Sequence, residues 1–111
     1  MSTLEDLRSK FGALAAYVVA AAGNPVPPFF ASDTGKLNNR AQAALATQDH
    51  IDGLIQKGNA IPQPHIGSCE DAINVALASM ATISKGMPGT LSASLVIAQI
   101  DNTNKLGMSL P

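Results

Sequence analysis

Segment 68–85 limits most strongly what this chain can fold into, because it carries a helix start, an apolar stripe and a helix stop. Ser68 is a suitable N-cap, and Asp71 follows it at the spacing of a capping box. Gly86 and Pro88 mark the end. No charged residue lies between Asp71 and the last residue of the segment. Such a helix has no strongly hydrated face, so we expect it to pack on more than one side.

Three other segments have a helical period. Segment 4–22 follows a capping box at Thr3, and its apolar residues alternate at spacings of three and four. Segment 40–57 has one apolar and one polar side. Segment 91–105 fits a strand or a helix, and we favour a helix because a lone strand would have no partner. The sequence predicts one all-α domain, residues 1–111, with three to four helices at about 4–22, 40–57, 69–85 and 91–105, joined by Pro/Gly-rich loops.

Segment 24–38 has neither a helical nor a strand period and is predicted to form an arm rich in proline and phenylalanine. Its prolines favour an extended course, and two phenylalanines follow them directly. The aromatic rings either fold back on the core of this chain or insert into a neighbouring molecule. For the second alternative, the expected interface combines the arm with a row of small residues on the first helix: Phe29, Phe30, Pro27, Pro28, Gly12 and Ala16.

Composition favours contacts between subunits. Hydrophobic residues make up 46% of the chain and charged residues only 14%, against about 25% charged residues in typical soluble domains. The net charge of −1 is spread without runs of either sign, which argues against a nucleic-acid partner. The uncharged segment 11–32 is interrupted by prolines after too few residues to span a membrane.

Acidic residues precede the uncharged segment, so a cleaved signal peptide is not expected. We predict a chain that is cytoplasmic or assembled into a particle such as a virion.

The sharpest candidate for catalysis or metal binding lies at the start of segment 68–85. His65, Cys69, Glu70 and Asp71 are close together in the sequence there, and the start of a helix lowers the pKa of a thiol. A metal site requires three or four converging ligands, and a nucleophilic Cys/His pair requires an oxyanion hole and usually a third residue. We identify neither, so we predict no catalytic residues, no metal and no cofactor, and we expect Cys69 to be structural.

Two functions remain as predictions. The first is a non-enzymatic structural subunit that acts by homo-oligomerisation or by incorporation with other proteins into a larger particle, such as a phage virion. The alternative is a small oligomeric module that sequesters an anionic metabolite or nucleotide, with Lys36, Asn39 and Arg40 near a helix start as the anion-binding residues. A minor enzyme hypothesis uses His65 and Cys69.

Overall fold

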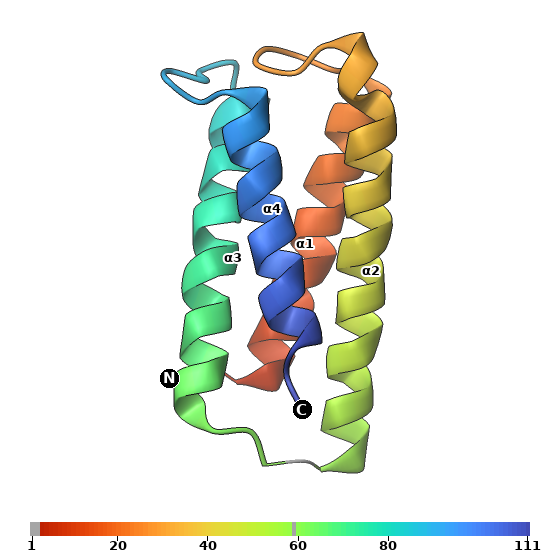
Figure 1. Cartoon of the computed structure of the whole chain (residues 1–111), viewed down its shortest axis with the longest axis vertical. Helices are drawn as coiled ribbons and strands as arrows, with labels where there is room; N and C mark the ends of the chain where they lie inside the picture. Colours follow the sequence, from red (N-terminus) through yellow and green to blue (C-terminus); the bar gives the residue numbers. More distant parts are fainter. Residues whose placement is uncertain (1–2, 59) are drawn as a thin grey trace.

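The computed structural model describes residues 3–58 and 60–111 and shows an all-helical bundle (Figure 1). Within those residues the elements are α1 (Leu4–Gly23), the short 3-10 helix η1 (Ala31–Asp33), α2 (Thr34–Lys57), α3 (Gln63–Ser84) and α4 (Ala93–Met108). The predicted fold class is therefore confirmed, and segment 91–105 is helical. Each long helix in the described ranges corresponds to one of the four predicted helices, but α2 and α3 begin earlier than predicted.

The ends of the helices follow from local sequence chemistry. The Oγ1 atom of Thr3 accepts a hydrogen bond from the Asp6 amide at 3.1 Å, and the Thr3 amide donates to Asp6 Oδ2 at 3.2 Å, which completes the predicted capping box. Ser92 caps α4 by accepting from the Leu95 amide at 3.1 Å. Gly58, which follows α2, has φ 68°, and Gly86, which follows α3, has φ 75°. Both adopt the left-handed conformation that glycine tolerates best.

Helices that follow one another in the sequence run antiparallel in this bundle, whereas two other pairs of packed helices run parallel. Chain direction alternates, so α1 and α3 run one way and α2 and α4 run the other (Figure 1). Helix α1 packs against α2 and α3, and α4 packs against the same two helices. The parallel pairs are therefore α1 with α3 and α2 with α4. Helix α3 packs on two sides, as its lack of charge predicted.

The core runs along the axis of the bundle and is built mainly from aliphatic side chains. Phe11 is the largest fully buried residue. Its ring lies against Gly107 of α4, where an added Cβ atom would be 2.7 Å from Phe11 Cζ and would also collide with the methyl group of Thr47. Glycine at position 107 therefore leaves the room that the Phe11 ring and the Thr47 methyl group occupy. The other large, fully buried side chains are Leu7, Leu14, Leu37, Ile51, Ile73, Met80, Ile83, Ile100, Val18, Val96 and Thr47.

The predicted start of α2 was wrong. Helix α2 begins at Thr34 rather than at residue 40, so the arm is shorter than 24–38. The Thr34 hydroxyl donates to the Ala22 carbonyl at 3.2 Å, and Leu37 and Ala41 extend the buried stripe toward the start of the helix. This tertiary contact makes the early turn of α2 favourable despite its polar sequence.

The predicted start of α3 was also wrong, because the helix begins at Gln63. Pro62 precedes it and Pro64 lies in its first turn, where a missing N–H removes no intrahelical hydrogen bond. Ser68 is therefore inside the helix, and its hydroxyl donates to the Pro64 carbonyl at 2.9 Å instead of capping. None of the helices in the described ranges is long and apolar enough to cross a membrane.

Candidate interaction surface

The two neighbouring phenylalanines of the arm point to opposite environments. Phe29 is 2% exposed and belongs to the core of its own chain, whereas Phe30 is 71% exposed. The backbone holds this arrangement, since the Phe30 amide donates to Asp33 Oδ2 at 2.8 Å and the Asp33 amide donates to the Phe30 carbonyl at 2.9 Å. Phe29 is thus not available to a partner in this conformation, because its ring fills the intramolecular core. Phe30, Pro27 and the half-buried Pro28 remain on the surface.

The small residues of α1 also divide between two roles. Gly12 faces α2, where an added Cβ atom would lie 2.6 Å from Gln48 Nε2. It therefore permits a close contact inside the chain rather than one between subunits. Ala16, one turn further along, is exposed.

Ala16 lies in a segment of α1 that has no charged residue. The contacts of Arg8 with Asp52 and of Gly12 with Gln48 set the antiparallel register of α1 and α2. That register places Leu45 level with Ala16, and Val19 follows within one turn. Val19 is 49% exposed and Leu45 39%. We call Ala16, Val19 and Leu45 the α1/α2 face.

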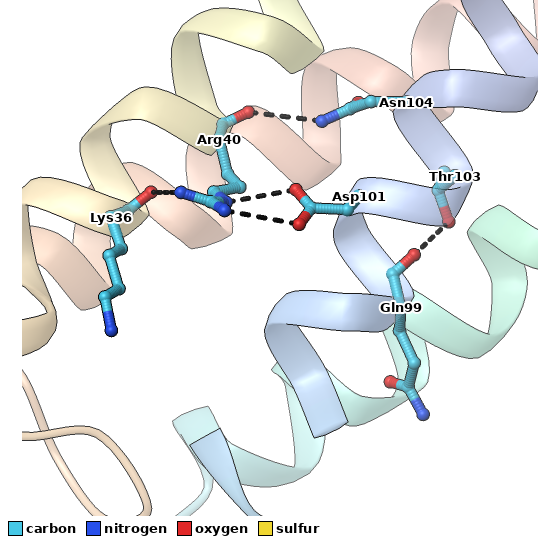
Figure 2. A network of polar contacts seen from close by, with 6 residues as sticks. All are labelled: Lys36, Arg40, Gln99, Asp101, Thr103 and Asn104. Carbon is cyan, nitrogen blue, oxygen red and sulfur yellow. Dashed lines mark hydrogen bonds and ion pairs between the residues drawn. The ribbon is translucent and has the colours of Figure 1, made fainter. Parts of the chain in front are cut away.

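The residues proposed for anion binding are separated by the fold. Arg40 forms a bidentate ion pair with Asp101 of α4, with Nε 3.0 Å from Oδ1 and Nη2 3.2 Å from Oδ2 (Figure 2). Its charge is therefore neutralised within the chain. Asn39 is exposed inside α2, beyond the first turn, so it is not beside free helix N–H groups. Lys36 lines a separate hollow of about 500 Å³ near the start of α4. The structure brings no anion site together from these three residues.

The polar contact between α2 and α4 was not anticipated from sequence. Asn104 is 6% exposed, and its Nδ2 atom donates to the Arg40 carbonyl at 3.4 Å (Figure 2). Its Oδ1 atom has no hydrogen-bond partner among the described residues. Thr47 and Thr103 are also buried on this side and donate to carbonyls of their own helices, four residues back. The sequence signal for this buried polar contact was that Thr103 and Asn104 follow Ile100 at helical spacing, on the same face of the helix.

The candidate chemical cluster on α3 does not form a reactive site. Cys69 is fully buried, and desolvation raises the pKa of its thiol to about 11, opposite to the change that activates a nucleophile. His65 and Asp71 are exposed, and Glu70 forms an ion pair with Lys10, with Oε2 3.1 Å from Nζ. Across the described ranges, no three His, Cys, Asp or Glu side chains are grouped so that they could hold a metal ion.

His50, in the second half of α2, makes a contact that contributes to the fold. Its Nε2 atom lies 2.7 Å from the carbonyl oxygen of Leu110, whose side chain is buried. This contact holds the end of the described chain against the bundle. The sequence offered no signal for it, because the two residues are sixty positions apart.

Comparison of the chain with models of known protein families finds no match, and comparisons with curated protein sequences and with solved structures also find none.

Proposed function

We propose that this chain is a non-enzymatic structural subunit that acts by self-association or by incorporation into a larger particle. The observation that carries the proposal is Phe30. This ring is 71% exposed although the backbone on both sides of it is held in place by the buried Phe29 and by the hydrogen bonds of Asp33. An aromatic side chain presented on an ordered backbone loses little further entropy when a partner covers it.

The α1/α2 face supports the same proposal. Val19 and Leu45 add apolar area beside the exposed Ala16, and no charged residue occurs from Phe11 to Ser32 or from Ala41 to Gln48. Ala16, Val19 and Leu45 can therefore be covered without desolvation of an ionised side chain. A virion component is one particle protein of this type.

Light scattering coupled to size exclusion tests the proposal directly. We expect the wild type to elute at a multiple of 11.4 kDa at micromolar concentration and to remain there in moderate salt, since the proposed contacts are apolar. Phe30→Ala should lower the mass of the oligomer, or raise the protein concentration at which the oligomer dissociates, without loss of helix content. A monomeric wild type at high micromolar concentration would show that self-association is wrong.

A charge scan locates the interface. Val19→Lys places an ammonium group on the α1/α2 face, and we expect it to dissociate the oligomer. Val75→Lys is the matched control, because Val75 is similarly exposed, at 51%, but lies on α3. Dissociation by Val75→Lys alone would move the interface to α3 and leave the α1/α2 face without a role.

A further inference from the structure

A second feature, independent of self-association, is a hollow between the ends of α1 and α3. Its volume is about 300 Å³, whereas an apolar cavity of roughly 150 Å³ is enough to hold benzene. No acidic or basic side chain lines it. We call it the α1/α3 hollow, and its lining residues are Tyr17, Ala20, Ala21, Asn24, Val26, Met80, Ile83 and Ser84.

The last-turn carbonyl groups of two lining residues accept no hydrogen bond in the described part of the chain. They are Ala21 at the end of α1 and Ser84 at the end of α3. Pro25, four residues after Ala21, has no N–H group, and after Ser84 the chain turns at Gly86 (φ 75°), so that the N–H groups of Gly86 and Met87 bond to the carbonyls of Ile83 and Thr82 instead. Carbonyls in a last helical turn point along the axis, past the end of the helix. Two acceptors are thus left beside one apolar hollow.

The helix dipoles increase the negative potential at the same place. Because α1 and α3 run parallel (Figure 1), their carboxyl ends lie at the same end of the bundle, and each carries a partial negative charge. Neither helix has a basic residue in its last turn, whereas α2 has Lys57 and α4 has Lys105. Lys85 follows α3, but it is exposed and does not line the hollow.

We propose that the α1/α3 hollow binds a small compound with a primary ammonium group on an apolar body. The ammonium group donates hydrogen bonds to the carbonyl oxygens of Ala21 and Ser84, to which no described backbone N–H bonds. The body packs against Val26, Met80 and Ile83, and the Tyr17 ring offers a π face to the cation. An anionic compound is repelled by the two helix ends, and a neutral one lacks the charge that they stabilise.

The first experiment compares three probes of similar shape on the wild-type chain. Benzylammonium, benzyl alcohol and benzoate are titrated separately while methyl NMR signals of Met80 and Ile83 are followed. We expect saturable shifts with benzylammonium and roughly tenfold weaker binding of benzyl alcohol, the difference expected from two helix ends. Benzoate should give no saturable shift. Equal affinity for the alcohol and the amine, or no saturation with the amine, would overturn the proposal.

The second experiment places the probe. Ala20→Trp fills the hollow from an exposed position, and we expect it to abolish the shifts caused by benzylammonium. Ala13→Trp is the matched control, since Ala13 is also exposed on α1 but lies outside the hollow, and it should bind like the wild type. Unchanged binding by Ala20→Trp would show that the amine is bound elsewhere.

Discussion

The two parallel helix pairs of this bundle are held together by different chemistry. Between α1 and α3 the contact is largely apolar, and Lys10 reaches across near the start of α1 to Glu70 and Asn74. Between α2 and α4 the contact includes the Arg40–Asp101 ion pair and the buried Asn104 (Figure 2). Parallel neighbours are not joined by a short loop, so side chains alone must select them. We expect the apolar pair to contribute more to stability and the polar pair to restrict which surfaces can meet.

The polar pair contributes little net stability. Arg40 and Asp101 are partly exposed, and ion pairs of this kind contribute at most about 1 kcal/mol. The unpaired Oδ1 atom of Asn104 is a cost, because a buried polar atom loses its hydrogen bonds to water. Substitutions in the two pairs should therefore differ in size and even in sign.

The largest effect is expected from shortening an apolar side chain between α1 and α3. Met80 is 2% exposed, and Met80→Ala should lower the free energy of unfolding by about 2–5 kcal/mol through lost burial and an enlarged cavity. Urea denaturation followed by circular dichroism measures this change. A loss below that caused by Asp101→Ala would contradict the division between the two helix pairs.

Alkaline pH should destabilise the chain through Cys69 on α3. Its pKa is raised from 9.0 to about 11 in the folded protein by desolvation. Above pH 9 the unfolded chain loses the thiol proton while the folded chain keeps it, so stability falls as the pH rises from 9 to 11. The loss is on the order of 2–3 kcal/mol.

Unfolding curves measured from pH 8 to 11 on the wild type and on Cys69→Ala check this expectation. The variant differs from the wild type only by the thiol, so the difference between the two curves isolates Cys69. A difference that does not change with pH would show that the thiol is not desolvated in the folded state.

Gly107→Ala tests the close packing of α4. The added methyl group collides with Phe11 and Thr47, so we expect a loss of about 1–3 kcal/mol, although alanine favours a helix by roughly 1 kcal/mol. Gly53→Ala is the matched control, because no atom lies within 4 Å of its added Cβ. That control should gain up to about 1 kcal/mol. A stabilising Gly107→Ala would mean that α4 is held less closely than the structure shows.

The smallest change in stability, and the sharpest test of the comparison, is Asn104→Leu. Replacing the amide removes the unpaired acceptor and should leave stability unchanged or raise it by up to about 1 kcal/mol. We expect the cost to be lost specificity, visible as additional or broadened amide NMR signals of α4. A destabilised variant with a single sharp set of signals would assign Asn104 to stability instead.

Local sequence determined which parts of this chain are helical. The capping box at Thr3, the glycines after α2 and α3 and the apolar periods are effects within a few residues, so they are readable without a structure. The carbonyls of Ala21 and Ser84 also lack a partner for local reasons, namely Pro25 after α1 and the turn at Gly86 after α3.

Tertiary structure decided the start of α2, the opposite environments of Phe29 and Phe30, and the pairing of Arg40 with Asp101. Each depends on contacts between residues distant in sequence, such as Thr34 with Ala22 and Arg40 with Asp101. A helical period shows which face is apolar but not which helix covers it. For the same reason, the sequence identified the arm as aromatic, while only the packed bundle determined that Phe29 fills the core and Phe30 remains exposed.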